Sequence, residues 1–411
     1  MTSPLRQTAH CLGLAILALA LTGCVNHTVK STSVPPLVSP ASEVPEALLL
    51  DVGIAIFDPG LDEYEEDAQI YPEVRKAEAR FMPRLLSEAM QNSGAWGAVR
   101  VVPSAAQITD LRVQGTILHS DGEELQLQIV ATDSRNTVWL DRTYTGHASR
   151  YAYDSVTRVQ YDPFQAVYHT IANDLLKELE ALKTVTREHI RVITELRFAQ
   201  GFSPDAFENY LSHSDSGRYR IERLPAHDDP MLERVRSIRE RDHMFVDTMQ
   251  EYYGNFSGQM QTPYQEWRKL SYEEAVALQE LKDESMRRLI AGGVAVLAGI
   301  AAASSSEGSS RAAGNVAIIG GGYLLKSGLE KRNEAQIHVE ALEELGMSLE
   351  AEITPQVIEL EDRTIMLSGN VEDQYAQWRE LLADIYRAEI GDLAIPTESA
   401  NNASAMRDGL N

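Results

Sequence analysis

Basic residues are scarce in this chain. Its 411 residues include 37 Lys and Arg against 61 Asp and Glu, which gives a formal net charge of −24. Such a surface repels the phosphate backbone of nucleic acids, so we expect no nucleic-acid partner. It also repels anionic lipid headgroups, so any attachment to a membrane must depend on something other than a basic patch.

Motifs that identify a reaction are missing as well. The ten histidines form no His-Glu-x-x-His pair, and the nearest match to a Gly-x-Ser-x-Gly elbow, 254–258, has Phe256 in place of serine. The acidic residues at 62–67 and at 228–229 lack the spacing and the glycine of an EF-hand. The sequence therefore predicts no enzymatic activity, with no catalytic residue, no metal site and no cofactor.

The first apolar run, Cys11–Leu21, is short. A bilayer span needs about 20 residues, whereas the core of a secretory signal has about 7–15. The run ends in Leu21-Thr22-Gly23-Cys24, which resembles the lipobox of bacterial lipoproteins (Leu, a small residue, Gly or Ala, then Cys). The resemblance implies that 1–23 are a signal peptide, recognised by its peptidase through Leu21, Thr22 and Gly23. An ordinary signal with an incidental cysteine is the alternative.

The same resemblance implies that Cys24 is the lipidation site, the first residue of the mature chain, and the carrier of acyl chains such as palmitate. Val25 stands where an inner-membrane retention signal has Asp, which implies sorting to the outer membrane with the protein facing the periplasm. Since Cys11 would leave with the signal, the mature chain has no disulfide, and its stability must come from its core.

Residues 24–46 are rich in Ser, Thr, Val and Pro and lack a helical period. They predict a flexible tether, with a buried extended arm as the alternative.

Residues 47–185 show apolar and alternating patterns typical of an α/β domain. The predicted order is a strand in 48–57, a helix over 73–92, four strands in 97–102, 110–120, 124–133 and 137–148, and a helix over 163–183. This order resembles the periplasmic α/β domains of curli secretion-channel lipoproteins and TolB-like amino-terminal domains. The resemblance implies a role in envelope assembly, although a fold alone does not give a function.

Residues 186–286 are charged and helix-forming, and predict a helical region. Ser271 followed by Glu274 predicts a capping box and hence the start of a helix. A group of aromatic residues is expected to pack in a core or interface, with a ligand-stacking surface as the alternative. Its members are Tyr252, Tyr253, Phe256, Tyr264 and Trp267.

Residues 287–332 contain two apolar stretches, 289–303 and 312–325, separated by a polar turn. Small residues recur at every fourth position, which predicts a tightly packed helical hairpin. The segment resembles the glycine zippers of outer-membrane lipoproteins. Fifteen helical residues rise about 22 Å, short of an ordinary bilayer core but marginal for the thinner outer membrane. Contact with the membrane, contact within an oligomer, and burial in the protein's own core all remain open. The candidate contact residues are Ala291, Ala295, Gly299, Ala303, Ala313, Ala317 and Gly321.

Residues 333–392 predict a small α/β unit with the order strand, turn, strand, helix, and 393–411 predict a disordered tail. The stretch 363–378 looks like half of a BON-type module, a small envelope domain that contacts membranes or peptidoglycan-linked partners.

The sequence thus predicts an α+β or α/β protein: a mixed α/β domain, a helical middle with a glycine-rich hairpin, and a small C-terminal α/β unit. The predicted function is a lipid-anchored scaffold or oligomerising component at the outer membrane. Its expected partners are membrane lipid through Cys24 and a second copy or another envelope assembly protein. The alternative is a periplasmic enzyme, such as a cell-wall hydrolase, with its site in the α/β domain. An enzyme needs a pocket with converging titratable groups, whereas a scaffold needs an exposed apolar or oligomeric surface.

Overall fold

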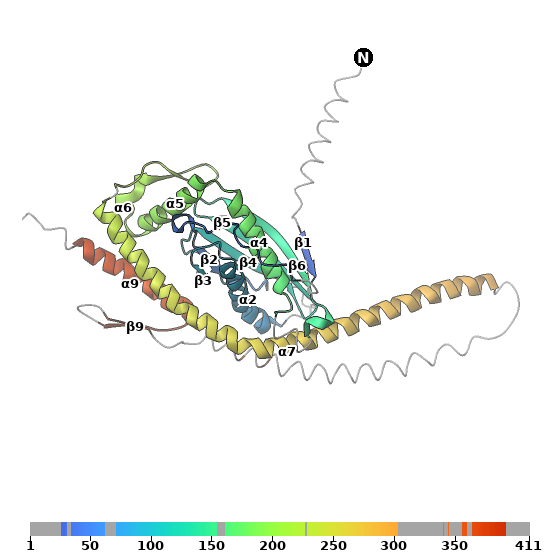
Figure 1. Cartoon of the computed structure of the whole chain (residues 1–411). Helices are drawn as coiled ribbons and strands as arrows, with labels where there is room; N and C mark the ends of the chain where they lie inside the picture. Colours follow the sequence, from blue (N-terminus) through green and yellow to red (C-terminus); the bar gives the residue numbers. More distant parts are fainter. Residues whose placement is uncertain are drawn as a thin grey trace, which may run out of the picture.

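Figure 1 shows the computed structural model of the chain, which describes residues 26–30, 34–61, 71–153, 161–226, 228–302, 340, 344, 356–359 and 364–391. A mixed parallel and antiparallel sheet lies beside a set of packed helices, and a strand pair and a helix follow near the C-terminus. The predicted α+β fold class is confirmed.

The sheet has six strands in the order β1-β6-β5-β4-β2-β3. Strand β2 pairs in parallel with β3 and β4, β4 to β6 form an antiparallel meander, and β1 pairs in parallel with β6. The strands are β1 (Asn26–Lys30), β2 (Val52–Ala55), β3 (Val99–Val102), β4 (Leu111–Ser120), β5 (Glu124–Asp133) and β6 (Val138–His147). Five of them, β2 to β6, fall in the segments where the sequence predicts strands.

One core lies between this sheet and two helices, α2 (Pro72–Asn92) and α4 (Gln165–Ala181). Alternation explains the inward face of β5: Leu125, Leu127 and Ile129 are buried, while the intervening Gln126 and Gln128 are not. Strand β2 is buried along its whole length, because Val52 and Ile54 belong to this core and Ala55 to a second one.

The second core joins α5 (Thr184–Phe202), α7 (Pro230–Ala302) and α9 (Val371–Gly391) to the β2–β3 edge of the sheet. Helix α5 crosses the predicted domain boundary at 185/186, and the C-terminal unit packs on α7. These segments therefore share a core with the sheet. The remaining elements are α6 (Pro204–Phe207), the strands β7 (Leu211–His213), β8 (Tyr219–Ile221), β9 (Gln356–Glu359) and β10 (Thr364–Leu367), and the 3₁₀ turns Glu46–Leu48, Arg150–Tyr153 and Glu208–Tyr210.

Helix α7 corrects one prediction. It is a single helix of 73 residues that passes through Ser271, so no helix begins there and the predicted capping box is wrong. The helix continues to Ala302, which places the first apolar stretch on a helix as far as that residue; the second stretch, 312–325, lies outside the described residues. In the described ranges, no helix combines the length and hydropathy needed to cross a membrane.

The predicted tether over 24–46 is also wrong in part. Val38 donates its amide hydrogen to Asn173 Oδ1 (2.8 Å), Asn173 Nδ2 donates to the carbonyl of Pro36 (3.0 Å), and His169 Nδ1 lies 2.8 Å from the carbonyl oxygen of Pro35. These side chains come from α4, and they satisfy the backbone of an extended proline-rich segment that has few amide hydrogens of its own. Residues 35–38 therefore lie extended along α4, but Pro36 and Val38 are exposed, so the alternative of a buried arm does not hold for them either. Residues 26–30 form β1 at the sheet edge.

Candidate functional site

A cluster of buried polar residues fixes the middle of the long helix α7 to the sheet domain, and we call this cluster the α7 seat. Its residues are Arg75, Glu78, Ser120, Gly122, Asp162, Tyr264, Arg268 and Ser271. They come from α2, from the end of β4 and the turn after it, from the segment before α4, and from α7 itself.

An apolar cluster surrounds the seat. Phe256, Met260, Tyr264 and Trp267 of α7 pack on Val74, Ala77 and Phe81 of α2. The rings of Tyr264 and Trp267 stack at 5.9 Å, and the ring of Phe81 meets that of Tyr264 edge-on at 5.3 Å. The prediction that these aromatic residues pack in a core is confirmed for Tyr253, Phe256, Tyr264 and Trp267, while Tyr252 is only half-buried.

Glu78 is the centre of the seat and is completely buried. Its Oε1 accepts hydrogen bonds from the hydroxyls of Tyr264 (2.6 Å) and Ser120 (2.7 Å), and its Oε2 lies 3.6 Å from Arg75 Nε. Burial raises the pKa of Glu78, although the charge of Arg75 and the two hydroxyl donors oppose this shift. The carboxyl thus joins α2, β4 and α7 through groups that water does not reach.

A second buried pair lies one turn further along α7. The guanidinium of Arg268 forms an ion pair with Asp162, and both side chains are under 5% exposed. Burial alone would lower the pKa of Arg268, but the charge of Asp162, the hydrogen bond to it, and the nearby Tyr264 and Tyr153 together raise the pKa. The guanidinium also lies 4.1 Å from the ring centre of Tyr264, in cation–π contact. Removing one member of such a pair would leave the other charged and buried.

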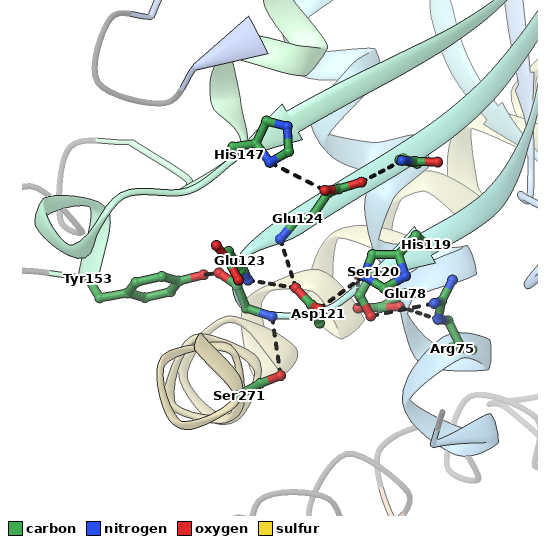
Figure 2. Close-up of polar contacts among 12 residues, drawn as sticks. Arg75, Glu78, His119, Ser120, Asp121, Glu123, Glu124, His147, Tyr153 and Ser271 are labelled. Carbon is green, nitrogen blue, oxygen red and sulfur yellow. Dashed lines mark hydrogen bonds and ion pairs between the residues drawn. The ribbon is translucent and has the colours of Figure 1, made fainter. Parts of the chain in front are cut away.

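The β4–β5 turn rests directly on α7, as Figure 2 shows at Ser271. The amide of Gly122 donates to Ser271 Oγ (3.2 Å), and the hydroxyl of Tyr153 donates to the carbonyl of Gly122. A Cβ at position 122 would overlap the backbone of Arg268 and Tyr272. The turn can therefore approach α7 this closely only because residue 122 is glycine.

Asp121 keeps the same turn in shape. Its Oδ1 accepts the amide hydrogens of Glu123 (2.6 Å) and Glu124 (2.7 Å), and its Oδ2 lies 3.0 Å from His119 Nε2 (Figure 2). Burial opposes ionisation of Asp121, but the hydrogen bonds from His119 and from the backbone lower its pKa overall. The carboxylate of Asp121 and the imidazole of His119 are thus engaged in structural contacts within the turn.

The predicted contact stripe is placed only in part. Ala291, Ala295 and Gly299 lie on the backbone of α7 near its end, four residues apart and so on nearly the same side of the helix. Ala303, Ala313, Ala317 and Gly321 lie outside the described residues, as do Leu21, Thr22, Gly23 and Cys24. In the part of the chain that is described, no group of three His, Cys, Asp or Glu side chains could hold a metal ion.

The sequence does not reveal the seat, although it contains weak signals for it. Glu78 lies between Ala77 and Ala79 in the sequence of α2, and Arg268 directly follows Trp267. A charge on an apolar face points to a buried partner, but the partners lie 186 and 106 residues away in the chain.

No protein-family model matches the chain, and no curated protein matches its sequence. Its function must therefore be inferred from its own residues and geometry.

Proposed function

We propose that this protein is a lipid-anchored lipoprotein of the bacterial outer membrane that faces the periplasm and acts as a scaffold or oligomerising component, without catalysis. Cys24 is the anchor in this proposal, and the small residues at the far end of α7 form the contact with a second copy, another envelope protein or the membrane.

One observation carries the proposal: α7 is a single helix that is fixed at one part of its length and extends away from the sheet domain at the other (Figure 1). Tyr272 packs on Tyr153 at the seat, with ring centres 5.2 Å apart. The 30 residues from there to Ala302 rise about 45 Å at 1.5 Å each. The buried Arg268–Asp162 ion pair and the Tyr264–Glu78 hydrogen bond hold α7 in a fixed direction, so its far end can position a partner rigidly.

The direction of α7 also bears on the alternatives for the apolar stretch. The backbone of 289–302 lies beyond the sheet domain in Figure 1. This supports a contact outside the body over burial in the protein's own core. A stripe of small residues lets a second helix backbone approach closely, which is the contact expected of an assembling helix.

The anchor is tested by comparing Cys24→Ala with the matched variant Cys11→Ala. We expect the first variant to lose labelled palmitate and to leave the outer-membrane fraction, and the second to behave as the wild type. If Cys24→Ala is still processed and carries acyl label, the anchor is wrong.

The assembly role is tested by Ala295→Leu with Gly299→Leu, against the matched variant Ala301→Leu, which lies on another side of the same helix. We expect the double variant to reduce the size of the detergent-extracted complex, and Ala301→Leu to leave it unchanged. Equal complex sizes for all three proteins would contradict the proposal.

A further inference from the structure

A cavity of about 460 Å³ lies between α5 and α7, over the amino-terminal ends of the parallel strands β2 and β4. This volume falls in the range of small-ligand sites. The proposed scaffold function does not use this cavity. Its lining is almost entirely charged: Asp51, Asp110, Arg191, Val192, Glu195, Arg236, Arg239, Glu240 and His243.

Two carboxylates line the sheet end of the cavity. Asp110 is 2% exposed, and its Oδ2 accepts the amide hydrogen of Asp51 at 2.9 Å. Its Oδ1 is buried and accepts no hydrogen bond of good geometry among the described residues, and the nearby hydroxyl of Thr194 donates to the carbonyl of Ile190. Burial raises the pKa of Asp110, and the Thr194 hydroxyl, the amide of Asp51 and the charge of Arg239 oppose this shift only in part. A buried carboxylate oxygen without a donor is costly, so this atom marks a place where a donor group can bind.

The helix side of the cavity supplies the opposite charge. Arg191 donates to the carbonyls of Glu46 and Leu49, and Arg236 pairs with Glu195 at 2.6 Å, so both guanidiniums are engaged. Arg239 differs, because its buried Nε finds no acceptor within the described ranges. The imidazole of His243 lies on the same side of α7, and burial together with the charge of Arg239 lowers its pKa to about 4, which leaves it neutral.

From these groups we infer that the cavity binds a small zwitterion, namely a free amino acid or a dipeptide. Its ammonium group lies against Asp110 and Asp51, and its carboxylate against Arg239. A simple anion would meet the four carboxylates that line the cavity, and a simple cation would meet its three guanidiniums. A ligand that carries both charges satisfies the donor that Asp110 needs and the acceptor that Arg239 needs.

The site is tested by calorimetric titration of the full-length protein with the twenty common amino acids and glycylglycine, each separately. At least one probe should bind saturably at a single site. Blocking either charge of that probe, as an N-acetyl derivative or as a carboxamide, should weaken binding by about tenfold to hundredfold, as expected for the loss of a charged hydrogen bond.

The variants Asp110→Asn and Arg239→Gln should each weaken binding by the same factor, while the matched variant Arg234→Gln, on α7 but outside the cavity lining, should not. If circular dichroism shows that Asp110→Asn does not fold, the binding measured for Arg239→Gln decides the test. Arg239 is only partly buried, so its replacement disturbs the fold less. Saturable binding that is lost in the cavity variants supports the site. The inference is overturned if no probe binds, if only inorganic phosphate binds, or if the cavity variants bind the probe as tightly as the wild type.

Discussion

The hydroxyl of Tyr264 on α7 donates a 2.6 Å hydrogen bond to Glu78 on α2, a carboxyl that no water reaches. The two residues are 186 positions apart in the chain. Their contact is the centre of the α7 seat, so the stability of the seat depends on groups that have no alternative partner in solvent.

Replacing Tyr264 with phenylalanine keeps the ring packing but removes one of the two hydroxyl donors to Glu78. We expect the free energy of unfolding to fall by about 1–3 kcal/mol, the usual cost of leaving a buried acceptor short of a donor. Urea titration followed by circular dichroism measures this loss. Tyr151→Phe, at a residue that is 68% exposed, is the control and should change stability by less than about 0.5 kcal/mol. Equal effects of the two variants would contradict the role of the hydrogen bond.

The stability of the seat should also depend on pH through Glu78. Its pKa is raised by burial above the ordinary value of 4.5, so the folded state keeps the proton at pH values where the unfolded state has released it. Stability due to this carboxyl is therefore present at low pH and is lost as the pH rises from about 4.5 through the folded pKa. Glu78→Gln cannot ionise, so wild type should lose stability relative to the variant over that window, in urea titrations at successive pH values. A constant difference between the two proteins would show that the pKa is not shifted.

Local patterns in the sequence were enough to predict most of the α/β order. Alternation in β5 and the helical period of α2 each place apolar side chains on one face, and a single buried face then fixes the element. The short strands β7 and β8, three residues each, have no such period and were not predicted.

The errors arose where tertiary contacts override local preference. Ser271 and Glu274 have the spacing of a capping box, yet the hydroxyl of Ser271 accepts a hydrogen bond from Gly122 in the β4–β5 turn while the helix continues. Pro36 looks like part of a linker, but its carbonyl binds Asn173 on α4. Likewise the α7 seat and the charged cavity join residues from distant segments, and no spacing rule can bring these together.

Gly122 allows a direct test of how closely the turn must approach α7. Gly122→Ala places a methyl group against backbone atoms of Arg268 and Tyr272. Backbone atoms within a helix cannot move aside as a flexible side chain can. We expect a loss of about 1–3 kcal/mol in urea unfolding. Gly254→Ala and Gly258→Ala on α7 have no atom within 4 Å of the new Cβ, and should be neutral or stabilising by up to about 1 kcal/mol. A neutral Gly122→Ala would mean that the turn does not rest on the helix.

Strand β3 is the last strand at one edge of the sheet, and the side chain of Gln250 pairs with its free side. The amide of Gln250 on α7 accepts the amide hydrogen of Val101 (2.9 Å) and donates to its carbonyl (2.8 Å), in the place of a neighbouring strand. Gln250→Leu should cost about 1–3 kcal/mol and increase aggregation on heating, because an unpaired strand edge invites pairing with another chain. The exposed Gln261 on the same helix provides the matched variant, Gln261→Leu. If light scattering and stability are the same for both, Gln250 does not protect the edge.

His243 should make the protein sensitive to acid. Burial, aided by the charges of Arg239 and Arg100 and opposed by Asp51 and Asp247, lowers its pKa from 6.5 to about 4. The unfolded chain therefore takes up a proton near pH 6.5 and the folded protein only near pH 4, so stability is lost as the pH falls through this window. His243→Gln removes the titrating group, and its free energy of unfolding should decline less than that of wild type between pH 6.5 and 4. His189→Gln, at an exposed residue of α5, should follow wild type throughout. Parallel pH profiles for wild type and His243→Gln would show that the imidazole is not held in its neutral form.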